Sequence, residues 1–425
     1  MKNPIIRYVV VFCLLIVSYL AFAFISIYLP EGRIKRSVEK SVEMGDIMTD
    51  YPRAIVNKEV CRMDCYTDAL ILNQVYSSSK QEPLRSVMLV PSIGDENDKT
   101  EWLNAAVTGV TEPIHNYPRY WHGSTFFTRW VMLLCGRYAN LQLFLFYTSS
   151  LALLALFMLL CRKRNYQLAI CLFLAMLLLK CYVSQFLIQL YPAFFISIVS
   201  AIFATLLKSR DKLRLLLFVT GSLTAYFDLM TTPLLTLGLP LLVILADDSI
   251  EKENYGSILK EIIIISVLWG VGYASTWVAK WIIATLLTGT NVIADAISIS
   301  KYRINGVVSG EIASVSSITV WDSLYANLSK CPLGLILVII LLLAITACFA
   351  FNKKGVKKAV VYLFVALFPL LYYMVVANQT YVHCWFTYRA LVVTVAGVLM
   401  ALSSIIDWKR LKKTRCYMRK QSQKE

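Results

Sequence analysis

The chain has 425 residues, of which 58% are hydrophobic and only 16% are charged, whereas a soluble globular protein usually has about 45–50% apolar and about 25% charged residues. This composition excludes a soluble domain, a disordered chain, a collagen and a small disulfide scaffold. The 42 Lys and Arg against 26 Asp and Glu give a net charge of +16. In so apolar a chain, this excess reflects the gathering of Lys and Arg in loops on one side of a membrane and not a nucleic-acid partner. We therefore expect an all-α polytopic membrane protein with about ten transmembrane helices and a long extracytoplasmic loop after the first helix.

The first apolar run, residues 8–29, follows a basic start and resembles a signal peptide. Its length of about 22 residues exceeds the usual 7–15-residue core of such a peptide, so we expect a retained transmembrane helix. Because a bilayer core of about 30 Å needs roughly 20 apolar residues, nine further runs qualify as candidate spans. These runs are 141–161, 166–183, 186–207, 215–230, 232–246, 261–285, 333–352, 358–377 and 389–406.

Two of these candidate spans, 215–230 and 232–246, are either full spans or a re-entrant pair, because Pro233 and Pro240 interrupt them. Four connections on one side of the predicted membrane domain are rich in Lys and Arg, whereas the connection at 378–388 has neither. The basic connections are 162–164, 208–214, 352–358 and 408–420. The positive-inside rule then puts both termini in the cytoplasm of a multi-pass cell-membrane protein.

The predicted organisation has four parts. Residues 1–30 form the first transmembrane helix, 31–140 an extracytoplasmic loop with amphipathic helices, 141–406 a membrane domain of about nine helices, and 407–425 a basic cytoplasmic tail. The loop is too long for a simple connector, which indicates that it carries function.

Two carboxylates in the loop are the predicted catalytic residues. In a helix over 64–76, Asp64 and Asp68 are four residues apart and lie on one face. Capping of the helix N-terminus is the alternative role for either residue. Asp46 and Asp50 repeat the spacing in a strongly charged stretch, where a solvated face is the simpler explanation.

Two aromatic clusters carry the predicted binding residues on the outer side. The segment YPRYWHG contains Arg119 and His122 with the aromatic residues Tyr120 and Trp121, and NQTYVHCWFTYR contains another such group. The residues of the second group are His383, Trp385 and Arg389. The alternative is an interfacial aromatic belt, which explains the aromatic rings but not the combination of His with Arg.

Ionisable residues inside apolar runs are costly and mark functional sites. Asp228 ends the run at 215–230, and GYASTWVAKW places Trp277 and Lys280 on one stripe of the run at 261–285. A helix cap for Asp228 and snorkelling of Lys280 to the interface are the structural alternatives.

An enzyme at the outer membrane surface lacks nucleotide donors and must draw activated groups from lipids. A sugar transfer from a polyprenyl-phosphate-linked donor needs a base for the acceptor, cations for the departing phosphate and flat surfaces for sugar rings. Asp64 or Asp68 would be the base, and Tyr120, Trp121, Trp277 and Trp385 would stack on sugars. The phosphate or substrate would be bound by Arg119, His122, Asp228, Lys280, His383 and Arg389.

The arrangement of a first helix, a long outer loop with acidic residues and many further helices resembles the GT-C class of integral-membrane glycosyltransferases. In that class a loop Asp or Glu is the usual base, which the resemblance carries to Asp64 or Asp68. The segments YPRYWHG, TAYFDLMTTPLLTLGLP, GYASTWVAKW and NQTYVHCWFTYR also resemble uncharacterised polytopic proteins of Gram-positive bacteria.

The predicted function is sugar transfer to a cell-surface glycan or lipid acceptor, and the main alternative is a transporter or flippase for a glycolipid or anionic substrate. A membrane acyltransferase, a metal-dependent hydrolase or phosphotransferase, and a non-catalytic scaffold are further alternatives. The sequence has no HExxH motif, and we expect no protein-bound metal centre, with a divalent cation left open as a cofactor.

Overall fold

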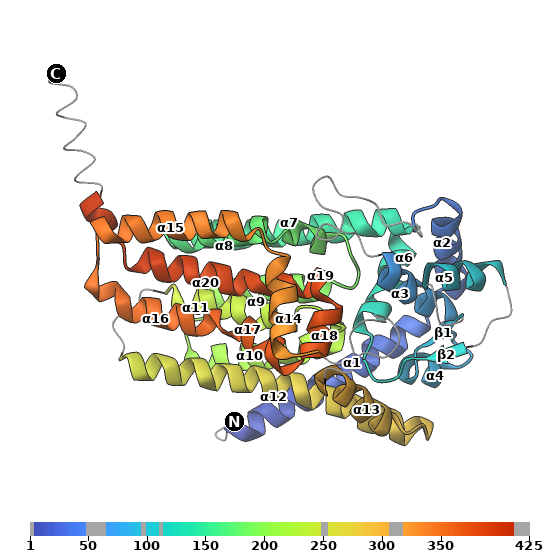
Figure 1. The fold of residues 1–425 in the computed structure, drawn as a ribbon. Helices are drawn as coiled ribbons and strands as arrows, with labels where there is room; N and C mark the ends of the chain where they lie inside the picture. The colour runs from blue at the N-terminus through green and yellow to red at the C-terminus, as the bar shows by residue number, and fades with distance from the viewer. Residues whose placement is uncertain are drawn as a thin grey trace.

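A computed structural model describes residues 4–47, 65–94, 99–109, 114–247, 254–305 and 318–411. This part of the chain is almost entirely helical, with one two-stranded antiparallel sheet (Figure 1). The all-α prediction is therefore confirmed. Asp50 and Asp64, together with residues 412–425 of the basic tail, lie outside the described residues.

The first third of the chain forms one long helix and a set of short elements gathered at one end of the molecule, on the right in Figure 1. In chain order these are α1 (Pro4–Ile27), α2 (Glu31–Glu43), α3 (Cys65–Ser77), α4 (Pro83–Met88), β1 (Pro91–Ile93), α5 (Lys99–Thr108), β2 (Ile114–Asn116) and α6 (Gly123–Cys135). The described parts of the segment 31–140 are thus mostly helical and pack against one another.

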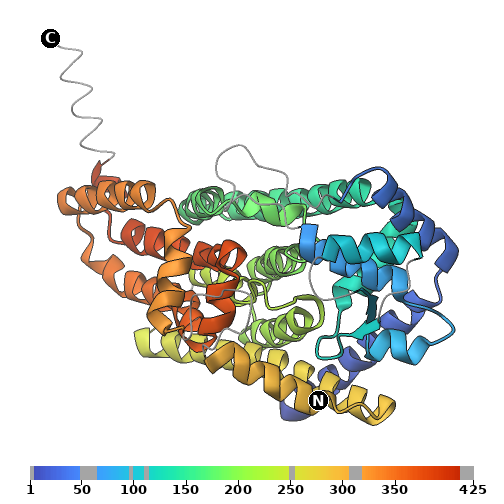
Figure 2. The same cartoon turned by 45° about the vertical axis from the view of Figure 1, so that its right-hand side comes forward.

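The remaining helices form an elongated bundle beside this set (Figures 1 and 2). They are α7 (Tyr138–Arg162), α8 (Tyr166–Leu178), η1 (Cys181–Gln185), α9 (Tyr191–Leu206), α10 (Arg210–Phe227), α11 (Leu234–Leu245), α12 (Tyr255–Thr288), α13 (Val292–Asn305), α14 (Val320–Ser329), α15 (Leu333–Phe349), η3 (Lys353–Gly355), α16 (Val356–Ala366), α17 (Phe368–Val375), α18 (Ala377–Val382), α19 (Cys384–Thr387), η4 (Tyr388–Ala390) and α20 (Leu391–Ser404).

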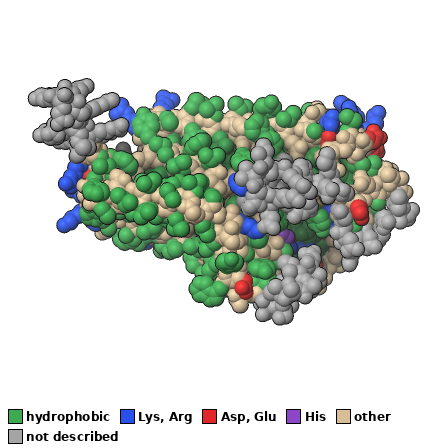
Figure 3. Space-filling model, turned by 45° about the horizontal axis from the view of Figure 1, so that its top comes forward, with side chains coloured by type: hydrophobic (Ala, Val, Ile, Leu, Met, Phe, Trp, Pro, Cys, Tyr) green, Lys and Arg blue, Asp and Glu red, His purple; other side chains and the backbone are tan. Residues whose placement is uncertain are grey.

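Five helical segments in the described part of the chain are long and apolar enough to cross a membrane, or six if the bent pair α14 and α15 is one span. The five segments are Ile5–Ile27, Tyr138–Arg162, Tyr255–Thr288, Lys353–Val375 and Cys384–Ser404. These helices indicate a membrane protein, and Figure 3 shows hydrophobic side chains covering a broad flank of the bundle.

The predicted count of ten spans is not confirmed. The runs at 166–183, 186–207 and 232–246 contain helices of 13, 16 and 12 residues. At a rise of about 1.5 Å per residue, the shortest of these is about 18 Å long, which is well below the thickness of the bilayer core.

Close contact between α10 and α12 holds the centre of the bundle together. A Cβ at Gly221 would lie 2.1 Å from the carbonyl oxygen of Trp269, and one at Gly272 would lie 2.1 Å from that of Phe218. Glycine on both helices lets the two backbones approach, as small residues do where membrane helices cross. This contact fixes the position of α12, whose later turns carry the site described below.

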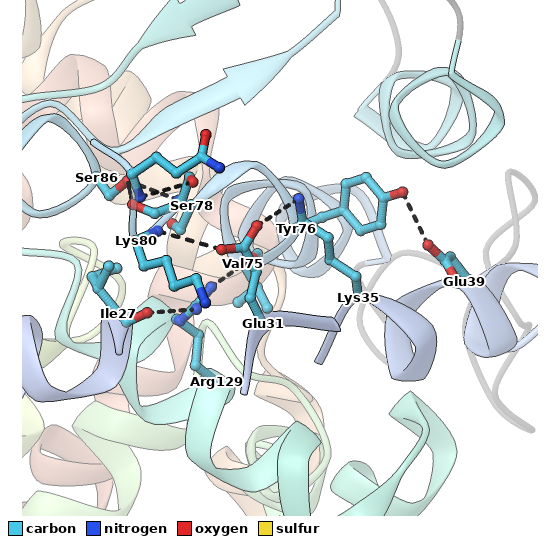
Figure 4. Close-up of polar contacts among 12 residues, drawn as sticks. Ile27, Glu31, Lys35, Glu39, Val75, Tyr76, Ser78, Lys80, Ser86 and Arg129 are labelled. Atoms are coloured by element: carbon cyan, nitrogen blue, oxygen red, sulfur yellow. Dashed lines mark hydrogen bonds and ion pairs between the residues drawn. The ribbon is translucent and has the colours of Figure 1, made fainter. Parts of the chain in front are cut away.

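Arg129 of α6 joins the short elements to the first helix (Figure 4). It is fully buried, and its Nε and Nη1 donate to the carbonyl oxygens of Ser26 and Val75 at 2.9 and 2.7 Å. These carbonyls belong to the last turns of α1 and α3, where backbone oxygens lack helical partners. Burial lowers the pKa of Arg129 to about 10, so the side chain stays charged at neutral pH.

Glu31 lies beside this junction and begins α2. Its carboxylate pairs with Lys35 at 2.8 Å and accepts a hydrogen bond from the backbone N–H of Lys80 at 3.4 Å. Burial raises the pKa of Glu31, but the stronger combined effect of the Lys35 and Lys80 interactions leaves it below the usual value. The charged Glu31 therefore holds the start of α2 against the segment after α3.

Candidate functional site

A cavity of about 130 Å³ lies between the turn at 117–122, the C-terminal half of α12 and α13. Its lining includes two cations, three aromatic rings and one residue of the turn between α10 and α11. These residues are Arg119, Arg303, Tyr120, Trp277, Trp281 and Met230. Val376, just before α18, also lines the cavity.

The two arginines differ in how their charge is compensated. Arg119 makes two hydrogen bonds to the carboxylate of Asp295, at 2.8 and 3.0 Å. Arg303 lies 3.1 Å from Nε2 of His383 through its Nη1 and forms no ion pair with a carboxylate among the described residues. The cavity therefore has an excess positive charge that comes from Arg303.

His383 is a neutral partner of this arginine. Its burial and the adjacent charge of Arg303 lower the pKa of His383 to about 3. A neutral imidazole can accept a hydrogen bond at Nε2 when the proton is on Nδ1. His383 thus orients the guanidinium of Arg303 without cancelling its charge.

Aromatic rings form the wall opposite α13. Tyr120 meets Trp277 edge to face with their centroids 4.8 Å apart, and Trp277 meets Trp281 at 5.9 Å. The indole nitrogen of Trp281 donates to the carbonyl oxygen of Arg119 at 2.9 Å, which ties α12 to the turn at 117–122.

Three buried N–H groups at the cavity have no hydrogen-bond partner among the described residues. They are Nε of Arg119, Nε1 of Trp277 and Nε of Arg303. Buried donors in folded proteins are nearly always satisfied, so a group of them in one cavity marks a place for acceptor atoms. Positive charge, unsatisfied donors and aromatic faces together suit an anion that carries a ring or an apolar part.

The turn at 117–122 is held in place by His122. This residue has a positive φ of 57°, and its Nε2 lies 2.7 Å from the carbonyl oxygen of Tyr117. The next residue is glycine, and a Cβ at Gly123 would lie 2.5 Å from the Tyr226 ring. Burial and the charge of Lys280 lower the pKa of His122 to about 3, so His122 is a neutral residue that shapes the turn.

Asp228 lies at the edge of this site, after the last residue of α10. It is buried and accepts hydrogen bonds from the backbone N–H and the hydroxyl of Thr231, so its side chain stabilises the turn between α10 and α11 and does not cap either helix. Its carboxylate is close enough to Tyr273 and Tyr372 for electrostatic interaction. The same two tyrosines interact in this way with Tyr120 of the cavity wall.

The structure gives Asp68 a different environment from the expected catalytic one. The side chain is fully buried, and its carboxylate accepts hydrogen bonds from the Tyr138 hydroxyl at 2.6 Å and from the backbone N–H groups of Ile188 and Gln189 at 2.9 and 3.2 Å. These contacts join α3 to α7 and to the segment before α9. Asp68 is not part of the cavity lining.

Lys280 and Trp121 are also interior structural residues and do not face the cavity. The Lys280 ammonium donates to the carbonyl oxygens of Val87 and Met88 at 3.1 and 3.0 Å, at the end of α4. Trp121 is 2% exposed, donates from its indole nitrogen to the Thr276 carbonyl oxygen and packs against two tyrosines. The buried position of Trp121 leaves no ring face for a sugar.

Arg389 and Trp385 lie in a separate cluster next to η1. Arg389 donates to the carbonyl oxygens of Lys180 and Trp385 at 3.4 and 3.2 Å, and Trp385 packs on Phe386. The prediction that Asp68, Lys280 and Arg389 converge in one pocket is therefore not met. Of the predicted binding and stacking residues, the cavity lining contains Arg119, Tyr120 and Trp277. His122, His383 and Asp228 do not line the cavity but contact residues in or next to its wall.

The sequence analysis did not single out Arg303, Trp281 or Asp295. Ala296, Ile299 and Arg303 recur at three- and four-residue intervals and form one face of α13. That spacing was the available signal, but the 286–332 segment is nearly balanced in charge and did not stand out.

No group of three His, Cys, Asp or Glu side chains in the described ranges is arranged to hold a metal ion. Comparison of the chain with protein-family models, with curated protein sequences and with solved structures gave no match.

Proposed function

We propose that the cavity binds the phosphate of a polyprenyl-phosphate-linked sugar and that the chain transfers this sugar to a surface glycan or lipid acceptor, as GT-C-type enzymes do. The observation that carries the proposal is the pair of arginines in one cavity, of which Arg303 has no carboxylate partner among the described residues. A phosphate ester supplies the negative charge and the acceptor oxygens that these donors need.

The aromatic wall supports the sugar part of the proposal. Tyr120, Trp277 and Trp281 present rings and a free indole N–H to the same space as the two arginines. Sugar rings pack against aromatic faces through their apolar C–H surfaces, while their hydroxyls take hydrogen bonds from side chains.

In the transfer, the bond between the sugar C1 and the phosphate oxygen breaks, and a bond between C1 and the acceptor oxygen forms. The bonding pair leaves with the phosphate, and Arg119 and Arg303 stabilise this anion. The acceptor hydroxyl loses its proton to a base. We assign the base to Asp228, which precedes the lining residue Met230 by two positions and forms no ion pair among the described residues, whereas Asp295 is paired with Arg119.

The test is an assay of purified protein in nanodiscs with radiolabelled polyprenyl-phosphate sugars and membrane-extracted acceptors. Arg303→Gln should lower transfer at least about 100-fold, because a hydrogen-bonded charge on the leaving group contributes roughly 3 kcal/mol to the transition state. Asp228→Asn should abolish transfer while donor binding persists.

Lys301→Gln is the matched control, since Lys301 is an exposed cation of the same helix outside the cavity lining. Normal transfer by Arg303→Gln, or equal loss in both variants, would refute the proposal. Movement of an unchanged glycolipid across the bilayer, with no transfer, would assign the same site to the alternative function of a transporter or flippase.

A further inference from the structure

A second and larger cavity, of about 450 Å³, lies at the other end of α12. Its lining comes from α8, α11, α12, the segment 352–358 and the end of α20. Tyr255 of this cavity and Trp277 of the first are 22 residues apart on one helix, which corresponds to about 33 Å at 1.5 Å per residue. The two cavities are therefore separated by about the thickness of a bilayer core.

The described lining of the second cavity is basic. Three of its residues are lysines, namely Lys354, Lys357 and Lys358, and none of the described lining residues is Asp or Glu. Trp408, Tyr255, Asn352 and Gln167 add aromatic faces and neutral polar groups to the same wall. Its volume falls within the range of about 300–1,000 Å³ that small-molecule sites occupy.

The wall that carries the lysines is firmly attached to the bundle. The backbone N–H of Asn352 donates to the carbonyl oxygen of Ile405 at 2.8 Å, and Phe351 pairs with Ile406 in an antiparallel bridge. A Cβ at Gly355 would lie 1.8 Å from the Ser404 carbonyl oxygen, so only glycine allows this approach. The Trp408 indole donates to the Ser403 carbonyl oxygen at 3.1 Å.

We propose that this cavity is a binding site for a phosphate-bearing ligand, with Lys354, Lys357 and Lys358 as the groups that recognise the phosphate. All three lysines line the same cavity, and the close approach at Gly355 fixes the backbone that carries them. The site is independent of the proposed transfer reaction, because it shares no lining residue with the first cavity. An anionic lipid headgroup and a soluble phosphate share this chemistry, and the experiment separates them.

The experiment uses the full-length protein and the triple variant Lys354→Gln, Lys357→Gln, Lys358→Gln. In the lipid arm, native mass spectrometry counts phosphatidylglycerol molecules retained after extraction from nanodiscs of phosphatidylglycerol and phosphatidylcholine in equal parts. In the soluble arm, equilibrium dialysis in neutral detergent measures binding of radiolabelled inorganic phosphate. The triple variant should bind the preferred ligand about 100-fold more weakly, because each lysine near an anionic phosphate contributes roughly a fivefold factor in affinity.

Lys353→Gln is the matched control, because Lys353 is exposed in the same segment but does not line the cavity. The triple Lys→Arg variant should bind like the wild type and shows that the substitutions do not disturb the fold. Loss in the lipid arm alone assigns a lipid headgroup, and loss in the phosphate arm assigns a soluble phosphate. Equal binding by wild type, triple Gln variant and Lys353→Gln in both arms would overturn the proposal.

Discussion

Asp68→Asn provides a direct test of whether Asp68 is a structural or a catalytic residue. The wild-type carboxylate accepts hydrogen bonds from the Tyr138 hydroxyl and from two backbone N–H groups, all in the protein interior. Asparagine keeps the shape of the side chain but replaces one acceptor oxygen by an NH₂ group. That group would face a buried donor, which leaves both without a partner.

The expected loss follows from these contacts. A hydrogen bond to a charged group contributes about 1.5–3 kcal/mol, and an unsatisfied buried donor costs about 1–3 kcal/mol. Asp68→Asn should therefore destabilise the protein by roughly 3–4 kcal/mol and lower the apparent Tm by about 5 °C or more. Tyr138→Phe removes the hydroxyl hydrogen bond but leaves the two backbone N–H donors to Asp68, and should cost about 1–2 kcal/mol.

The assay is thermal unfolding of the purified proteins in one detergent, followed by tryptophan fluorescence, with expression level as a second readout. Asp295→Asn is the control, because the side chain of Asp295 is 39% exposed. If Asp68→Asn has the wild-type Tm and expression but no transfer activity, the structural explanation is refuted and Asp68 is a catalytic residue.

Two further predictions concern packing and pH. Gly272→Ala should destabilise the protein by about 1–3 kcal/mol, because the added Cβ would clash with the α10 backbone. Gly270→Ala is the control and should be neutral or stabilising, because a Cβ there has no atom within 4 Å. Equal Tm values for the two variants would refute the close crossing of α10 and α12. His122 and His383 have pKa values lowered to about 3, whereas an unfolded histidine titrates near 6.5, so the unfolded chain binds more protons in that interval. Stability should thus fall as pH drops below about 6.5, by up to about 1.4 kcal/mol per pH unit for each histidine. His122→Gln and His383→Gln should each flatten this dependence in unfolding titrations, and an unchanged slope in both would contradict the assignment.

Three of the eleven residues that line the first cavity could be predicted from the sequence. Arg119 and Tyr120 in one motif and Trp277 in another were selected because charged and aromatic residues gathered where an apolar run ends. All three line the same cavity, although Tyr120 and Trp277 are 157 positions apart in the sequence. Local chemistry was a sufficient signal for these three residues, because each lies beside other charged or aromatic residues in its own segment.

The role of Asp68 could not be predicted in this way, because its partners are remote in sequence. Ile188 and Gln189 follow it by 120 and 121 residues, and their N–H groups reach the Asp68 carboxylate from the segment that precedes α9. The spacing of Asp64 and Asp68 carries no information about that turn. Arg303 was missed for the same reason, since its orientation depends on His383, 80 residues later.

The predicted ten spans are not confirmed, because apolar composition does not separate a lipid-facing helix from a buried one. In the most apolar 18-residue stretch of α7, Tyr138–Arg162, 22% of the residues are buried inside the protein, whereas in that of Cys384–Ser404 the share is 83%. Both segments are continuous apolar runs in the sequence, as expected for any helix surrounded by apolar groups. The apolar run at 232–246 is therefore predicted to be a span, although α11, the helix it forms, has only 12 residues.

The size of the first cavity restricts how the proposed donor binds. About 130 Å³ is smaller than the roughly 300 Å³ of a typical small-molecule pocket, so a complete glycolipid does not fit inside. Under the proposed function, the cavity would hold the phosphate and the adjacent part of the sugar, and the polyprenyl chain would stay in the bilayer. Exposed apolar residues of α12 and α13 next to the cavity, Ile282, Leu286, Ile297 and Ile304, offer a surface for it. Affinity would then depend mainly on the headgroup, so a donor with a shortened prenyl chain should retain its contacts with Arg119 and Arg303.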